Sequence, residues 1–242
     1  MTAVSDIICD ITPKISKDTE FEKMAEFAKQ NNIPFVETAK FDTLEQMKKH
    51  FFNEQIKRRN DLIKSARIPK IYTDIRAKDF IITEKNELAA TTAIKSVNEN
   101  NGLFIYGECG TGKTMLASII ANERAEIFKP SMFIRAVDIF HELNPHFSEN
   151  KLATVRKRNL LLSTPCVIID DLGAEKPSDF TRATLFDIID HRMNEGLQTI
   201  ITTNFNINEL KNRLNAKEEL NLSDKIIRRI KATCQLIELN HY

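Results

Sequence analysis

Short apolar runs alternate with longer segments along the last two thirds of the chain. The apolar runs have the length of β-strands, and they lie at residues 103–106, 131–135, 166–170, 199–203 and 235–239. The segments between them are predicted helices, notably 113–128 after a glycine-rich loop and 178–194. Strands that are apolar on both sides need helices over both faces, so the pattern predicts an α/β fold with a five-stranded parallel sheet sandwiched by helices.

The first 66 residues follow a different pattern, because they contain no glycine and place apolar residues at helical steps. Two predicted helices have faces made of Phe21, Met24, Ala25 and Ala28, and of Phe41, Leu44, Met47, Phe51 and Ile56. Pro69 ends this pattern, since the residue before a proline is pushed out of the helical region. We therefore expect a helical N-terminal region at 1–66 and a larger domain at 67–242. A region this small either packs on the rest of the chain or offers its apolar face to a partner.

Composition and charge limit the class of protein. The chain has 242 residues and a formal net charge of +1, so any binding to an anionic polymer must come from local basic clusters. The apolar runs are far shorter than the roughly 20 residues of a membrane helix, and no secretory signal is visible, so we expect a cytoplasmic protein without membrane contact. Four cysteines (Cys9, Cys109, Cys166 and Cys234) lack any C-x-x-C spacing, which argues against a disulfide framework and a structural zinc.

A phosphate-binding motif follows the first predicted strand. Residues 107–114 match G-x-x-x-x-G-K-[ST] at every position, and a predicted helix begins at the lysine. The glycines allow backbone N–H groups to converge on phosphate oxygens, Lys113 places a charge on the outer phosphates, and Thr114 offers its hydroxyl to Mg²⁺. We expect ATP to bind along Gly107, Glu108, Cys109, Gly110, Thr111, Gly112, Lys113, Thr114 and Met115, with no chemical role for the side chains at 108 and 109.

Two further strands end in polar residues. The strand at 166–170 is followed by paired acids, Asp170 and Asp171, at the edge where ligands of open α/β sheets bind. We expect Asp170 to hold Mg²⁺ through water and Asp171 to polarise the attacking water, since such a second carboxylate is typical of nucleotide hydrolysis. The strand at 199–203 ends at Asn204, which is our first choice to bond the water or the γ-phosphate. Thr203 is the second choice, and a simple turn-forming role for Asn204 stays open.

A basic helix is predicted at 222–231, just before the last strand. Its arginines have two interpretations. They form a solvated helix face, or they include an arginine finger that reaches the γ-phosphate held by a neighbouring subunit, because a guanidinium stays charged and matches phosphate oxygens in a fork.

Taken together, these residues resemble the helicase-loader branch of the AAA+ ATPases, that is the DnaC/DnaI-type loaders and their IstB-like relatives. The resemblance extends from about Ile68 to the C-terminus. It rests on the 107–114 loop, on Ile169-Asp170-Asp171-Leu172-Gly173, on Thr202-Thr203-Asn204 and on a Ser-x-x-Ile-x-x-Arg-Ile pattern at 223–230. It implies a P-loop NTPase core of the AAA+ (ASCE) type without a helical lid, with Arg229 in the arginine-finger position and Arg228 as the runner-up.

The same resemblance implies a function. Such a protein uses ATP binding and hydrolysis to control the deposition of a replicative DNA helicase, a DnaB-type hexamer, on single-stranded DNA, and it self-associates to supply the finger in trans. The 1–66 region would then hold the helicase. An IstB-like ATPase helper of a DNA transposase is the alternative. A P-loop kinase and an inactive ATP-binding adaptor fit less well, because paired acids point to hydrolysis.

Overall fold

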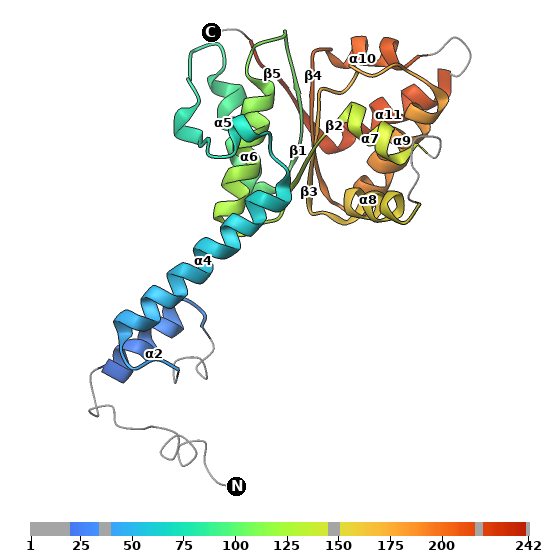
Figure 1. Cartoon of the computed structure of the whole chain (residues 1–242). Coiled ribbons are helices and arrows are strands. Elements are labelled where there is room, and N and C mark those ends of the chain that lie inside the picture. The colour runs from blue at the N-terminus through green and yellow to red at the C-terminus, as the bar shows by residue number, and fades with distance from the viewer. Residues whose placement is uncertain (1–19, 34–39, 145–150, 216–219, 241–242) are drawn as a thin grey trace. The chain divides into compact units, whose positions relative to one another are not determined.

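The computed structural model describes residues 20–33, 40–144, 151–215 and 220–240 (Figure 1). Its contacts group the chain into two compact units, Met1–Arg58 and Arg59–Tyr242. The helix α4 (Leu44–Ala66) spans both groups, and its residues from Arg59 onward belong with the second unit. The domain boundary at 66/67, which was expected from Pro69, stays a prediction.

The second unit is built on a parallel five-stranded sheet. Its strands are β1 (Gly102–Tyr106), β2 (Met132–Arg135), β3 (Cys166–Asp170), β4 (Gln198–Thr203) and β5 (Cys234–Glu238). They lie in the order β2-β3-β4-β1-β5. The predicted α/β fold with five parallel strands is confirmed. Because β4 separates β1 from β3, the carboxyl ends of these three strands are neighbours at one edge of the sheet.

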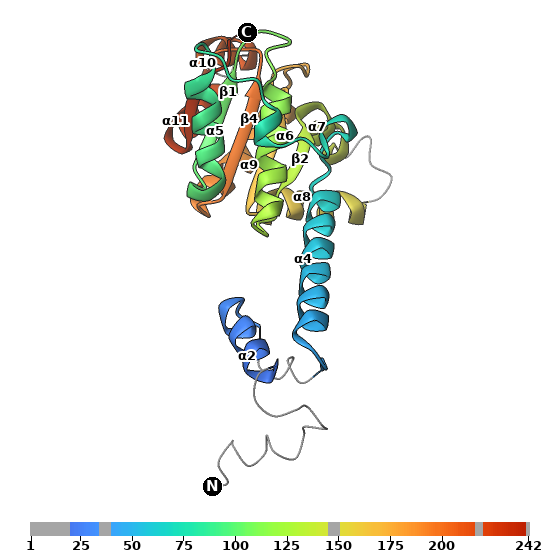
Figure 2. The same cartoon turned by 90° about the vertical axis from the view of Figure 1, so that its left-hand side faces the viewer.

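Helices cover both faces of this sheet. Helices α5 (Glu87–Glu99) and α6 (Lys113–Glu126) cover the face that Figure 2 presents to the viewer. On the other side lie α7 (Ala136–Leu143), α8 (Lys151–Ser163), α9 (Asp179–Asn194), α10 (Ile207–Leu214) and α11 (Leu220–Thr233). Successive strand residues point to opposite faces, so Leu103 and Ile105 join the α5–α6 core while Phe104 joins the other. Burial on both faces explains why β1 and β3 are almost wholly apolar.

The first unit contains α2 (Glu20–Gln30) and the N-terminal part of α4, which confirms the predicted helical character. Met24, Ala28 and Met47 are buried together. Phe27 packs against them and meets the ring of Phe51 edge to face, with 5.6 Å between the ring centroids. Ile56, which the pattern placed on the same face, is exposed.

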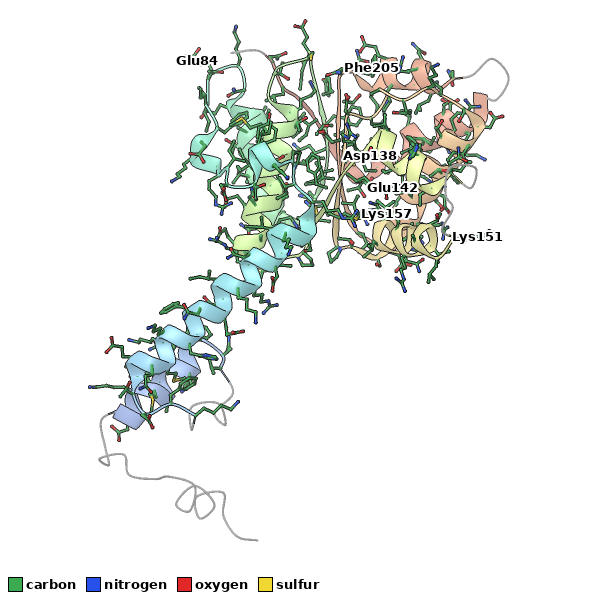
Figure 3. All side chains as sticks on the ribbon, viewed as in Figure 1. Glu84, Asp138, Glu142, Lys151, Lys157 and Phe205 are labelled. Atoms are coloured by element: carbon green, nitrogen blue, oxygen red, sulfur yellow. The ribbon has the colours of Figure 1, made fainter. Side chains whose placement is uncertain are left out.

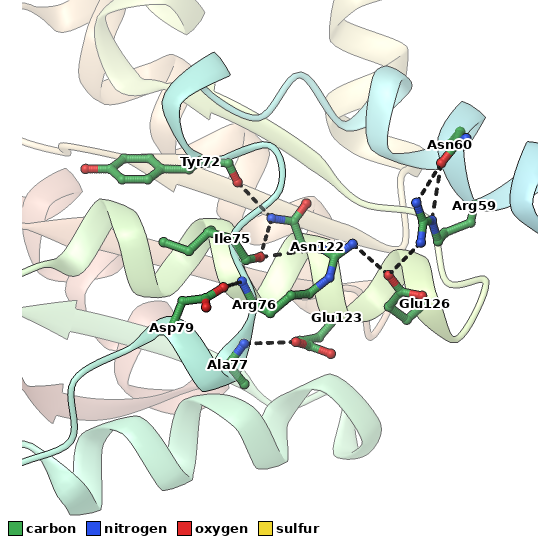
Figure 4. Close-up of polar contacts among 10 residues, drawn as sticks. All are labelled: Arg59, Asn60, Tyr72, Ile75, Arg76, Ala77, Asp79, Asn122, Glu123 and Glu126. Carbon is green, nitrogen blue, oxygen red and sulfur yellow. Dashed lines mark hydrogen bonds and ion pairs between the residues drawn. The ribbon is translucent and has the colours of Figure 1, made fainter.

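Within the second unit, a carboxylate at the end of α6 joins α4 to the segment that follows it (Figure 4). Glu126 accepts from Arg76 at 2.7 Å and from Arg59 at 3.4 Å. All three side chains are partly exposed, so each pair alone contributes little to stability. Together they fix the C-terminal part of α4 beside α6.

Two more side chains of α6 hold the backbone of the segment between α4 and α5. The amide of Asn122 donates to the carbonyls of Tyr72 and Ile75, at 2.8 and 2.9 Å. Glu123 accepts from the backbone N–H of Ala77 at 3.0 Å (Figure 4). The segment contains two short 3-10 turns, η1 (Lys70–Tyr72) and η2 (Ala77–Asp79). It is therefore pinned along the helix that begins at the phosphate-loop lysine.

Three of the four cysteines lie in the described residues, and all three are free thiols; Cys9 lies outside them. Cys109 is exposed, whereas burial raises the pKa of Cys166 and of Cys234 to about 11. Neither buried thiol ionises near neutral pH. In the same described ranges, every helix is too short or too polar to cross a membrane.

Candidate functional site

The loop between β1 and α6 has the backbone that its glycines predict. Gly107, Gly110 and Gly112 have φ angles of 152°, 85° and 92°, a region that residues with a side chain rarely adopt. At Gly107 there is also no room, because an added Cβ would lie 2.2 Å from the carbonyl oxygen of Leu239. The glycines thus allow a loop whose N–H groups face a ligand at the start of α6.

Lys113 is the first residue of α6, and its side chain folds back over the loop. Its Nζ donates to the carbonyl oxygens of Gly107 at 3.0 Å and of Glu108 at 2.6 Å. The residue is only 8% exposed. Burial lowers the pKa of the ammonium, and the charges of Cys109, Asp171 and Asp170 oppose that shift. The two carbonyls supply the hydrogen bonds that a buried ammonium group needs.

Asp170 ends β3 and is bound by two hydroxyls. The hydroxyl of Thr114 donates to its carboxylate at 3.0 Å, and that of Thr202 on β4 donates at 2.6 Å. Asp170 is 5% exposed. Burial raises the pKa of its carboxyl group, and the bonds from Thr202 and Thr114 oppose that shift. A buried carboxylate beside a threonine hydroxyl supplies the hard oxygen ligands that Mg²⁺ takes in nucleotide sites, so the predicted metal ligands fit this cation.

Asp171 is exposed and begins the turn after β3. Its φ of 56° is left-handed, and its backbone N–H donates to the hydroxyl of Thr202 at 2.9 Å. The amide of Asn204 donates to its carboxylate at 3.4 Å. Thr203, the second choice in the sequence, instead donates to the carbonyl of Leu172 at 2.6 Å and supports the turn.

These side chains line one cavity of about 340 Å³ at the carboxyl edge of the sheet. Its lining includes the predicted Lys113, Thr114, Asp170, Asp171 and Asn204, together with the loop residues Cys109, Gly110, Gly112 and Met115. The geometry thus brings together candidates from three strand ends. A cavity of this volume, lined by a lysine, a hydroxyl and glycine backbone, is suited to a polyphosphate.

Sequence reasoning missed three residues of the lining, Tyr72, Arg135 and Thr202. Thr202 carried a signal, because it begins the polar end of β4, and a buried polar residue needs a partner. Arg135 ends β2 and forms a two-fold ion pair with Asp138, both bonds 2.8 Å long. Tyr72 reaches the cavity through the pinned segment before α5, for which the sequence carries no signal.

Arg229 is not among the residues that line this cavity. Its guanidinium forms an ion pair with Asp190 of α9 and lies 4.6 Å from the ring centroid of Phe186. Ser223 and Ile230, from the same sequence pattern, are fully buried. The spacing of the pattern therefore partly reflects packing of α11. Arg228 is exposed.

Comparison with known proteins agrees with the resemblance inferred from the motifs. A family model described as IstB-like ATP binding protein matches residues 19–241. The replicative helicase loader DnaI of Bacillus subtilis is 32% identical over 166 residues, which cover 65% of this chain and 53% of that protein. The chain spans about half the length of the curated relatives it matches.

Two solved structures have the same fold. A crystal structure of DnaI superposes with a TM-score of 0.65 at 28% identity, covering 72% of this chain and 95% of that one. The crystal structure of the DnaC helicase loader gives a TM-score of 0.60 at 25% identity, covering 71% and 99%. With a phosphate loop, paired acids and this strand order at one sheet edge, the chain belongs to the family of IstB-like ATP-binding proteins.

Proposed function

We propose that this chain binds Mg·ATP in the cavity at residues 107–115 and hydrolyses it. The observation that carries the proposal is a hydrogen bond to the buried Asp170 from Thr114, the residue that follows the loop lysine. Thr114 and Asp170 would hold Mg²⁺, which when bound neutralises charge on the phosphates. Lys113 would leave the loop carbonyls for the outer phosphates. The 107–112 backbone would donate to phosphate oxygens.

Asp171 and Asn204 would orient the attacking water. Both lie on the cavity, and their mutual hydrogen bond supports a shared role. Asp171 would accept a proton from the water, whereas Asn204 would fix the carboxylate and donate to the water or the γ-phosphate. This pair favours hydrolysis over the kinase alternative and over an inactive adaptor.

The adenine would enter a second, apolar cavity of about 270 Å³ beside the first. Phe80, Ile82, Ala90 and Leu116 contribute to its lining. Leu116 follows Met115, which lines the phosphate cavity, so both cavities are lined by residues of the first turn of α6. Stacking and apolar contact suit a purine ring.

The proposed biological role is the loading of a replicative DNA helicase on single-stranded DNA. It is supported by the names of two similar proteins, the replicative helicase loaders DnaI and DnaC. Helices α2 and α4 would contact the helicase. DNA contacts would be mainly to phosphates and therefore sensitive to salt. The alternative, a helper of a DNA transposase, is favoured by the IstB-like family description alone.

Self-association would complete the catalytic site. Because Arg229 lies outside the lining of its own cavity, it would act on the nucleotide of a neighbouring subunit as an arginine finger. It would first have to leave its ion pair with Asp190.

One pull-down tests the role. A tagged chain is incubated with a purified DnaB-type hexamer, with and without Mg·ATP, and Lys113→Ala serves as the nucleotide-binding control. Capture of the helicase that responds to ATP in the parent chain but not in Lys113→Ala supports the loader. Failure to capture the helicase in every condition, together with ATP hydrolysis by the parent chain, would leave the ATPase and remove the helicase as partner.

A further inference from the structure

The turn that carries Asp171 has an unusual backbone. Asp171 and Gly173 have φ angles of 56° and 97°, both left-handed. A residue with a side chain in this region costs on the order of 1 kcal/mol and persists only where its surroundings hold it. The contacts that hold this turn therefore determine where the Asp171 carboxylate lies.

One set of contacts comes from β4, whose end lies beside the turn. Thr202 accepts from the N–H of Asp171, and Thr203 donates to the carbonyl of Leu172. The N–H of Leu172 in turn donates to the carbonyl of Thr202 at 2.9 Å. These bonds fix the first half of the turn, before Gly173.

A second set comes from Arg213 on α10. Its Nε donates to the carbonyl of Gly173, and its Nη2 donates to the carbonyl of Glu175 at 3.3 Å. The guanidinium lies 5.1 Å from the ring centroid of Phe205, a residue that follows β4 and is labelled in Figure 3. An added Cβ at Gly173 would lie 2.8 Å from the same ring. The turn, the ring and the guanidinium are thus packed in direct contact.

Glu175 completes this arrangement inside the turn. It is 7% exposed, and its carboxylate accepts from the N–H of Gly173 at 2.9 Å. Burial raises the pKa of the carboxyl group, and the backbone hydrogen bonds at Glu175 and Gly173, followed by the charge of Arg213, oppose that shift. The buried carboxylate of Glu175 and the guanidinium of Arg213 thus both bond the backbone of the second half of the turn.

We propose that Arg213 is a positioning residue for ATP hydrolysis, which holds the 171–175 turn so that Asp171 faces the nucleotide. The inference rests on the proposed hydrolytic role of Asp171. Arg213 is not among the residues that line the phosphate cavity, so it acts through Asp171 and does not touch the nucleotide. Lysine is a poor substitute, because an ammonium lacks the planar fork that bonds two carbonyls and stacks on a ring.

The test measures ATP affinity, kcat and thermal unfolding in the full chain. Arg213→Ala should lower kcat about 10- to 100-fold, as expected when a catalytic group is misplaced by about 1 Å, while ATP affinity changes less than twofold. Arg213→Lys should fall between Arg213→Ala and the parent. Arg158→Ala is the matched control, because Arg158 is an arginine whose ion pair with Asp187 is exposed. This variant should retain the parental kcat.

A double mutant distinguishes positioning from general destabilisation. Because Arg213 acts through Asp171, adding Arg213→Ala to Asp171→Asn should lower kcat little further. The inference would be overturned if Arg213→Ala lowered kcat by the same factor in the parent chain and in Asp171→Asn. It would also be overturned if Arg213→Ala kept the parental kcat. If Asp171→Asn itself hydrolyses ATP at the parental rate, the proposed role of Asp171 fails, and the inference fails with it. Should Arg213→Ala not fold, Arg213→Lys carries the same comparison.

Discussion

The hydroxyl of Thr202 connects both acids of the site, and its removal has a measurable consequence. Thr202→Val keeps the shape and the β-propensity of the side chain. It deletes the 2.6 Å bond to the carboxylate of Asp170 and the acceptor for the N–H of Asp171. Thr203→Val is the matched control, because it deletes the neighbouring buried hydroxyl, which donates to a neutral carbonyl.

The magnitudes follow from the type of bond that each variant loses. A hydrogen bond to a charged group contributes about 1.5–3 kcal/mol, and a neutral one about 0.5–1.5 kcal/mol. For a chain of this size, 1 kcal/mol shifts Tm by roughly 2–4 °C. Thr202→Val should therefore lower Tm by roughly 3–12 °C, and Thr203→Val by roughly 1–6 °C. Thermal unfolding followed by circular dichroism measures both.

The pH dependence of stability distinguishes the two variants more sharply than the size of the decrease in Tm. The bond from Thr202 opposes the burial that raises the pKa of Asp170, so Thr202→Val should raise that pKa further. An acid with a raised folded pKa destabilises the fold above that pKa. The loss of stability in Thr202→Val, relative to the parent chain, should thus be full at high pH and shrink as pH falls through the raised pKa of Asp170. Thr203→Val should show a loss of stability that does not change with pH. Identical pH profiles for the two variants would refute this reasoning.

Four further predictions concern nucleotide and DNA. Lys113→Ala should weaken ATP binding at least tenfold, about 1.4 kcal/mol; an unchanged nucleotide titration would move the phosphate site elsewhere. Asp171→Asn should bind ATP normally but release phosphate about 10²- to 10⁴-fold more slowly, and parental phosphate release would exclude its role. A mixture of Arg229→Ala and Lys113→Ala should recover part of the ATPase activity that each lacks, whereas no recovery argues against a finger in trans. Anisotropy with a single-stranded oligonucleotide and ATP should show binding that weakens with salt; absence of binding at low salt removes DNA as a partner.

Much of the fold could be predicted from local patterns. The five strands were found because both faces of the sheet are covered, so that each strand carries a short run of apolar residues. The 107–114 loop was found because its backbone requires glycines. The strand order could not be found this way, because it depends on contacts between distant segments. That order explains why Thr202 reaches Asp170: β4 lies between β1 and β3.

The rest of the candidate site depends on tertiary contacts that leave no local pattern. The left-handed backbone at Asp171 is held by a bond to Thr202 of β4, and Tyr72 reaches the cavity in a segment whose carbonyls Asn122 bonds. The ion pair between Arg229 and Asp190 joins two helices that are far apart in sequence. A motif at 223–230 could place the arginine on α11 but could not indicate its partner.

The pairing of Arg59 with Glu126 bears on where the chain can be cut. Ala66 is 1% exposed and belongs to the same buried cluster as Leu116 and Ile120. A fragment that begins at Arg59 keeps this methyl group and the ion pair, whereas one that begins at Ile68 loses both. The loss amounts to about 0.8 kcal/mol for the methyl group and up to about 1 kcal/mol for the pair. The shorter fragment should therefore melt several degrees lower than the longer one, so the C-terminal part of α4 serves as the natural start of a stable fragment of the second unit.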